Sequence, residues 1–292
     1  MTLPRRIVPG TTYLITRRCA DRRMHLLPSP LMNRIYAYAL ARAQLKHGAA
    51  VHTFGAMGNH SHEVVTDVRG VLPDFLRDFH REVALAGKAI YGIPENFWSA
   101  EKPSVVELHG AIAQNEKAVY VMLNPVRAGL VARTTLWPGA ISLPETRRVV
   151  AQRPSVWFSD LNEDTLTLEL TPPPTWKGDA DSWHAWLADE LKRREDEIGR
   201  ERRAAGLPFL GAAKVLAQKP FDRPRNRDVL RPTRHPTLAT GGDGALMRGL
   251  IAGLRAWRRA YYDALGRWRI DKSTVFPFGT WWLVQRANAA FG

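Results

Sequence analysis

Two short stretches of the chain carry the side chains best suited to chemistry. The first is Asn59-His60-Ser61-His62, in which two histidines stand two positions apart. In an extended strand both imidazoles point to the same face, which is the minimum arrangement for chelating a divalent ion. One His-x-His pair lacks a third ligand, so a structural or solvated pair of histidines is the alternative interpretation.

The second stretch runs from Tyr120 to Val131 and reads YVMLNPVRAGLV. If a helix continues through Leu123, then Tyr120 and Asn124 are four residues apart and share a face. A tyrosine hydroxyl can act as a nucleophile and form a covalent intermediate. The structural alternative makes Tyr120 an aromatic at the edge of the core, Asn124 an N-cap and Pro125 the first residue of a following turn.

Two neighbouring charged residues bear on these stretches. An unperturbed tyrosine hydroxyl has a pKa near ~10, so a nucleophilic tyrosine needs help to ionise. Lys117, one turn before Tyr120, is a candidate for that help, and a solvated lysine is the alternative. Glu63 follows His62 in the strand pattern, so we expect it to point away from the histidines and to lie at the surface.

The first half of the chain predicts the elements that would position these residues. Their order is strand, helix, strand, strand, helix, strand, helix, over residues 11–18, 31–47, 51–57, 61–68, 72–91, 104–108 and 111–123. Pro125 disfavours helical geometry at Asn124, where the last helix is expected to end or kink. The order predicts an α+β fold, an antiparallel sheet with packed helices of the ferredoxin-like type.

The second half of the chain differs from the first in its composition and its residue patterns. We expect a connector near 137–144, an exposed strand over 165–171, a charged helix over 181–203, a helix over 245–269 and a strand-like stretch over 274–282. The proline-rich basic stretch 220–236 predicts an extended segment without regular structure. It is either a linker or a stretch that follows a nucleic-acid backbone.

The two chemical stretches together closely resemble the single-tyrosine His-hydrophobic-His (HUH) transposases, specifically the REP-associated tyrosine transposase branch. The matching features are Asn-His-x-His after a strand, then a helix with Tyr120 and, four residues later, Asn-Pro-Val-Arg-Ala-Gly-Leu-Val. Residues 10–18 match the usual opening strand of that family. The resemblance covers roughly residues 5–145 and implies a nuclease domain over 1–145, followed by a basic, mainly helical extension over 146–292.

The resemblance also implies a site and a reaction. His60 and His62 would hold Mg²⁺ or Mn²⁺, Asn124 would supply the third ligand, and Tyr120 would be the nucleophile. Tyr120 would cleave single-stranded or hairpin DNA, leaving a 5′-phosphotyrosine and a free 3′-OH. Dimerisation to a homodimer is expected from the resemblance alone.

Charge and composition are compatible with this interpretation. The 292 residues include 42 Lys and Arg against 28 Asp and Glu, a formal net charge of +14. Such a charge favours a polyanionic partner, and a merely basic, well-solvated surface is the alternative. The only cysteine, Cys19, excludes an intrachain disulfide and cysteine-based zinc clusters, so any metal must bind histidine, carboxylate or amide groups. We see no signal peptide or membrane-spanning run and expect a cytoplasmic protein.

Several arginines are candidates for contacts with DNA phosphates. Leu254, Trp257, Tyr261 and Leu265 share one face of the predicted helix 245–269. We assign these apolar and aromatic residues to the core. The arginines assigned to phosphate are Arg17, Arg18, Arg127, Arg255, Arg258 and Arg259.

Two functions therefore remain in view. The first is a metal-dependent DNA transposase or single-strand endonuclease that acts through Tyr120. The second is a domesticated protein that keeps the fold and binds structured DNA or RNA without cutting it. The presence of His60, His62, Tyr120 and Asn124 together favours the enzyme.

Overall fold

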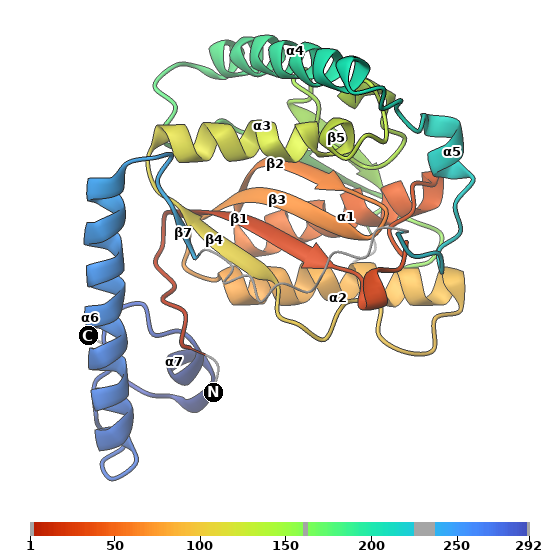
Figure 1. Ribbon diagram of the computed structural model, residues 1–292. Coiled ribbons are helices and arrows are strands. Elements are labelled where there is room, and N and C mark those ends of the chain that lie inside the picture. Colours follow the sequence, from red (N-terminus) through yellow and green to blue (C-terminus); the bar gives the residue numbers. More distant parts are fainter. Residues whose placement is uncertain (1–2, 160–162, 225–236, 291–292) are drawn as a thin grey trace.

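A computed structural model describes residues 3–159, 163–224 and 237–290 (Figure 1). Its strands are β1 (Thr11–Arg18), β2 (Ala50–Ala56), β3 (His60–Asp67), β4 (Ser104–Leu108), β5 (Arg148–Gln152), β6 (Thr165–Glu169) and β7 (Leu238–Ala239). Its helices are α1 (Pro30–His47), α2 (Leu72–Tyr91), α3 (Ala111–Arg127), α4 (Ala180–Ala204), α5 (Ala212–Leu216), α6 (Gly244–Trp268) and α7 (Trp282–Ala287). Two single 3₁₀ turns lie at Ala20–Arg22 and Thr134–Leu136.

The main sheet has five strands in the order β2-β3-β1-β4-β7. The first four pair antiparallel, and their sequence β1-α1-β2-β3-α2-β4 is the split βαβ arrangement of ferredoxin-like folds. The predicted α+β class is therefore confirmed. The prediction of a purely antiparallel sheet is wrong, because β7 adds to β4 in parallel. A two-residue strand from so far along the chain has no periodicity that a sequence pattern could reveal.

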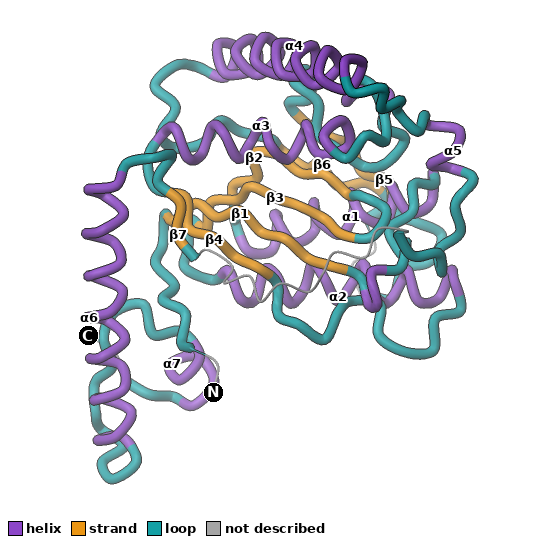
Figure 2. Tube along the Cα trace, in the orientation of Figure 1, coloured by secondary structure: helices purple, strands orange, loops and turns teal. Residues whose placement is uncertain are grey.

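Helices cover both faces of this sheet (Figure 2). Tyr13 and Ile15 of β1 and Val65 of β3 point into a core shared with α1 and α2. Leu14 of β1 and Val64 of β3 point the other way, against α3. The strict alternation of a strand thus separates the sheet into two differently covered faces, and α4 packs over the outer side of α3.

The first two helices begin and end where the sequence indicates. The Ser29 side chain accepts a hydrogen bond from the Met32 backbone N–H at the start of α1, and Gly48 ends that helix with φ +64°. Gly92 ends α2 with φ +61°. Glycine adopts this left-handed conformation without the steric cost that a Cβ brings.

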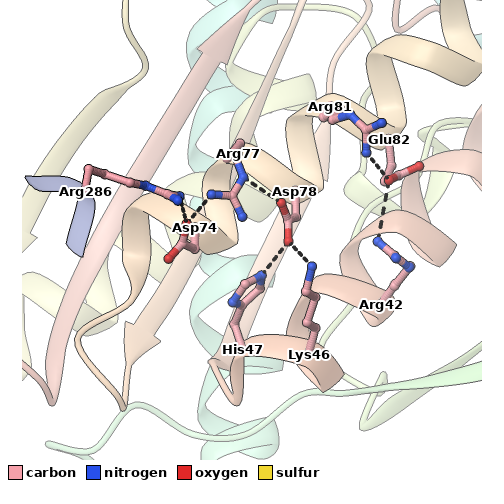
Figure 3. A network of polar contacts seen from close by, with 9 residues as sticks. All are labelled: Arg42, Lys46, His47, Asp74, Arg77, Asp78, Arg81, Glu82 and Arg286. Atoms are coloured by element: carbon pink, nitrogen blue, oxygen red, sulfur yellow. Dashed lines mark hydrogen bonds and ion pairs between the residues drawn. The ribbon is translucent and has the colours of Figure 1, made fainter. Parts of the chain in front are cut away.

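Polar side chains join α1 to α2 along their solvent edge (Figure 3). Lys46 Nζ donates to Asp78 Oδ2 at 2.6 Å, and His47 Nε2 lies 3.0 Å from the same oxygen. Burial alone would raise the pKa of Asp78, but these contacts and the guanidinium of Arg77 hold it well below its usual value. The cluster fixes the helix pair behind the sheet.

The chain after residue 145 packs onto the chain before it at several places. The β5-β6 hairpin lies on α1, and Leu166 and Leu168 enter the core that α1 and α2 share. The strand β5 was not predicted from the sequence. The predicted strand over 165–171 and the charged helix over 181–203 correspond to β6 and α4. The two parts expected on either side of residue 145 therefore share their cores.

The C-terminal elements lie beside the sheet edge that carries β7 (Figure 1). As predicted, Leu254 and Trp257 of α6 are buried, and Tyr261 packs with them. The prediction of a strand-like stretch over 274–282 is wrong, because those residues form an irregular segment with one turn at 278–279 that leads into α7. Phe276 is buried in a small core beside α6 and is not part of a sheet strand. The Phe278 carbonyl accepts a hydrogen bond from Trp257 Nε1 at 2.8 Å.

Further chain segments pair along β2 and β4. On the β2 edge, the Ala56 N–H donates to the Ala140 carbonyl and the Thr171 N–H donates to the Val51 carbonyl. Along β4, the Glu107 N–H donates to the Thr237 carbonyl and the His109 N–H donates to the Ala239 carbonyl. Within the described ranges, no helix is both long enough and apolar enough to cross a bilayer.

Candidate active site

The two histidines of the Asn-His-Ser-His stretch lie side by side on β3. His60 pairs with Arg18 and His62 with Thr16 in the antiparallel register of β1 and β3, so these four side chains share the face that α3 covers. The two imidazole rings are 4.7 Å apart between centroids and nearly perpendicular, at 83°. The predicted juxtaposition of the two imidazoles is confirmed.

One nitrogen of each imidazole is held by a neighbour. His60 Nδ1 lies 2.7 Å from the Asn59 side-chain oxygen, which can only accept, so Nδ1 donates and Nε2 keeps its lone pair. His62 Nδ1 lies 2.8 Å from the Thr16 hydroxyl. His62 Nε2 is buried and has no hydrogen-bond partner among the described residues.

The surroundings keep both imidazoles neutral at pH 7. Burial, followed by the charges of Arg18 and Arg22, lowers the pKa of His60 to about 4. Burial, followed by His60 and Arg18, lowers the pKa of His62 well below its ordinary value. A neutral imidazole with a free nitrogen is the form that binds a metal ion.

Tyr120 projects from α3 toward this pair. Its ring centroid is 5.3 Å from that of His62, with the planes at 73°. The side chain is half-buried beside Leu14 and Val64 of the sheet. Asn124 follows one turn later on the same helix face, as predicted.

The helix α3 does not end where the proline rule predicts. It continues through Asn124 and Pro125 to Arg127, so Asn124 is an interior residue and not an N-cap. Pro125 has no N–H, which removes one hydrogen bond from the helix. The Thr134 hydroxyl donates to the Met122 carbonyl at 3.1 Å in the same turn. This hydrogen bond and the buried ring of Pro125 tie the last turn of the helix to its surroundings, so tertiary packing overrides the local preference.

Two cations lie against the Tyr120 ring. Lys117 Nζ is 5.4 Å from the ring centroid and Arg127 Cζ is 5.8 Å from it. Both belong to α3, at positions i−3 and i+7 from the tyrosine. Neither forms an ion pair within the described residues, so their charge is not neutralised by a nearby carboxylate. The site therefore combines a tyrosine with two neutral imidazoles and two cations.

Two neutral imidazoles and an amide are donors that could hold a divalent metal ion. The unpartnered, buried Nε2 of His62 is a polar atom that a metal would satisfy. No group of three His, Cys, Asp or Glu able to hold a metal occurs in the described part of the chain. A third protein ligand would therefore be an amide, and Asn124 on the Tyr120 face of α3 has the required chemistry.

Some predicted site residues lie elsewhere. Arg17 points to the opposite face of the sheet, where its guanidinium lies 5.7 Å from the Trp98 ring centroid and donates to the Glu101 carbonyl. Glu63 also points away from the histidines, as predicted, but its expected exposure is wrong. It is fully buried and accepts a hydrogen bond from the Tyr36 hydroxyl of α1. Helices cover both faces of β3, so the side chains that point away from α3 are buried against α1 and α2.

The remaining arginines of the prediction lie on α6. Arg255 and Arg259 are exposed and Arg258 is half-buried, on a helix whose opposite face is packed. Of the stretch 220–236, residues 220–224 form part of a turn, and 225–236 lie outside the described residues. The structure thus brings Arg18 and Arg127 to the site and leaves the α6 arginines apart from it.

Two residues of the site were missed from the sequence. Thr16 holds His62 and Arg22 acts electrostatically on His60. Thr16 becomes visible only through the register of β1 against β3. No sequence pattern points to Arg22. In the structure, Arg22 and Asp21 adopt positive φ values of 59° and 51°, which are uncommon for residues other than glycine.

Comparisons with known proteins find similarities to solved structures, two of which are described below. No family model and no curated protein matches the chain. A REP-associated tyrosine transposase bound to a REP hairpin aligns with a TM-score of 0.41 and 17% identity, over 48% of this chain and 81% of that one. A transposase from Deinococcus radiodurans, described as putative, aligns with a TM-score of 0.29 and 16% identity, over 36% of this chain and 85% of that one.

Proposed function

We propose that this protein is a metal-dependent DNA transposase or single-strand endonuclease that cleaves and rejoins single-stranded hairpin DNA through Tyr120. The observation that carries the proposal is the contact between the Tyr120 and His62 rings, with His60 beside them. Packing alone does not explain why a tyrosine of α3 lies against buried imidazoles of β3 when His62 Nε2 has no hydrogen-bond partner among the described residues. The resemblance of these same residues to the HUH transposases supports the same conclusion.

The chemistry is a transfer of a phosphodiester between two oxygens. The Tyr120 hydroxyl loses its proton and its oxygen attacks the scissile phosphorus, while the bond from phosphorus to the 3′ oxygen breaks. The products are a 5′-phosphotyrosine and a free 3′-OH, which takes up a proton. Because the phosphodiester is conserved, a 3′-OH can attack the phosphotyrosine and rejoin the strand without external energy.

His60, His62 and Asn124 would hold Mg²⁺ or Mn²⁺. A bound ion of this kind would polarise the oxygens of the scissile phosphate. Thr16 and Asn59 orient the imidazoles through their Nδ1 atoms. Lys117 and Arg127 place positive charge beside the tyrosine ring, where a tyrosinate and a phosphate would both be stabilised.

The binding of DNA would rest on cations distributed over the surface. Arg18 and Arg127 are next to the site, and Arg255, Arg258 and Arg259 offer charge along α6. Such contacts to phosphate position the DNA and make affinity fall with salt. Arg17 is held by Trp98 and would contribute to the field more than to a direct contact.

The proposal is tested by covalent trapping. Labelled single-stranded hairpin oligonucleotides of varied sequence are incubated with the protein and Mn²⁺ or Mg²⁺, and adducts are separated on denaturing gels. Wild type and Tyr262→Phe, a control at an exposed tyrosine of α6, are expected to form an adduct, and Tyr120→Phe none. Tight binding without any adduct would favour the domesticated, non-cleaving protein.

A further inference from the structure

A second surface is built where the start of the basic proline-rich stretch meets the loop after β1. The Met24 N–H donates to the Asp222 carbonyl at 3.1 Å, and Arg223 Nη2 pairs with Asp21 Oδ2 at 2.8 Å. The segment after α5 therefore lies next to the 3₁₀ turn that follows β1 (Figure 1). Residues about 200 positions apart form one surface, which local sequence could not predict.

Phe221 is the exposed centre of this surface. Its side chain is 47% exposed although it is a large aromatic. The ring is held by His25, with centroids 6.1 Å apart at 80°, and by the Arg23 guanidinium, 5.9 Å from its centroid. His25 in turn is fixed by a hydrogen bond from its Nδ1 to the Phe97 carbonyl at 3.0 Å. The phenyl ring is thus supported from one side and open on another.

The same loop is tied to the histidine pair. The Cys19 N–H donates to the Asn59 carbonyl at 2.8 Å, and Asn59 Nδ2 donates to the Arg22 carbonyl at 3.4 Å. Asn59 is the residue that holds His60. The surface around Phe221 is therefore one loop away from the proposed cleavage site.

The charge of this surface is positive. Four basic residues, Arg22, Arg23, Arg223 and Lys219, accompany two acids. Asp21 pairs with Arg23 and Arg223, and the Asp222 carboxylate accepts a hydrogen bond from the Lys219 N–H. Proteins bind single strands by stacking bases on aromatic rings within a positively charged groove. An exposed phenyl ring held among arginines has this chemistry.

We propose that Phe221, with Arg22, Arg23 and Arg223, binds an unpaired nucleotide of the DNA strand that leads to the cleavage site. The base stacks on Phe221 and the arginines contact the flanking phosphates. This inference rests on the proposed function in taking DNA as the partner, and it adds a binding site contributed by the second half of the chain.

The test measures binding without cleavage. Fluorescence anisotropy is recorded without divalent metal, in the Tyr120→Phe background, for a blunt DNA hairpin and for the same hairpin with a single-stranded oligothymidine flank. Phe221→Ala is expected to weaken binding of the flanked hairpin about ten-fold, as the loss of one stacked base implies, and to leave the blunt hairpin unchanged. Phe221→Trp restores the affinity, and Phe158→Ala, at another exposed phenylalanine, has no effect.

A second measurement uses the unaltered side chain. With 5-iodouracil in the flank, ultraviolet crosslinking to the wild-type protein is expected to map to the peptide that contains Phe221. The inference is overturned if Phe221→Ala binds both hairpins like the control, weakens both equally, or if crosslinks map only elsewhere. If covalent trapping fails while Phe221 still contributes to binding of the flanked hairpin, the proposed cleavage is overturned and the binding site at Phe221 is supported.

Discussion

The ring of Tyr120 meets the ring of His62 edge-on, 5.3 Å between centroids and at 73°, within a single chain. The helix and the strand that carry them lie on the same face of the sheet, and His60 extends the contact on the strand side. The proposed nucleophile and the histidine pair therefore lie in contact within one chain.

Assembly in cis predicts that inactive variants do not complement each other. A mixture of Tyr120→Phe with a His60→Ala and His62→Ala double variant is expected to form no more DNA adduct than either protein alone. Adduct yield on denaturing gels measures this. Recovery of adduct in the mixture would mean that tyrosine and histidines come from different copies, as in an exchanged homodimer.

Thr16 is expected to act through His62. Thr16→Val removes the hydroxyl 2.8 Å from His62 Nδ1 and leaves the strand shape intact. The rate of adduct formation should fall about ten- to hundred-fold, the usual effect of losing a partner that orients a metal-binding histidine. DNA affinity measured without metal should stay the same, and Thr16→Ser should recover most of the rate.

Lys117 and Arg127 are expected to support the reaction more than DNA binding. Replacing either with Met removes a cation beside the Tyr120 ring and should slow adduct formation at saturating DNA about ten- to hundred-fold. Lys88→Met, on the helix pair behind the sheet, is the matched control. Equal losses in DNA affinity and no change in the saturated rate would assign these cations to binding alone.

Glu63 is expected to make the fold less stable at neutral and alkaline pH than at acid pH. Burial raises the pKa of its carboxyl from 4.5 to about 7, although the hydrogen bond from Tyr36 opposes the shift. Between these values the native state binds a proton that the unfolded chain has released, so stability falls as pH rises through this window and stays low above it. Glu63→Gln should therefore raise the free energy of unfolding at pH 8 by about 2 kcal/mol and change it little at pH 4.

Urea unfolding at the two pH values measures this effect. Glu169→Gln, at an exposed glutamate of β6, should show no such difference. A loss of stability in Glu63→Gln that is the same at both pH values would contradict a raised pKa for Glu63.

The sequence predicts local structure well where one periodicity dominates. Alternation across β3 brings His60 and His62 together, and helical spacing places Asn124 on the face of Tyr120. The helical pattern of α6 likewise separates buried Trp257 from exposed Arg255. These features depend on residues that are near one another in the chain.

Features that depend on distant pairing could not be predicted. The register of β1 against β3 places Thr16 beside His62 and turns Arg17 to the other face. The burial of Glu63 depends on α1, which supplies the Tyr36 hydroxyl. The parallel strand β7 and the docking of Phe221 beside Arg23 join segments that no local pattern relates.

In the proposed reaction, Tyr120 becomes covalently joined to DNA. The direct test is to digest wild-type protein after incubation with a hairpin oligonucleotide library and Mn²⁺, and to map nucleotide-modified peptides by mass spectrometry. We expect a 5′-phosphonucleotide on Tyr120 that is lost in Tyr120→Phe and in His60→Ala or His62→Ala. Modification of a different residue, or none across the library while Tyr120→Phe and wild type bind DNA alike, would contradict it.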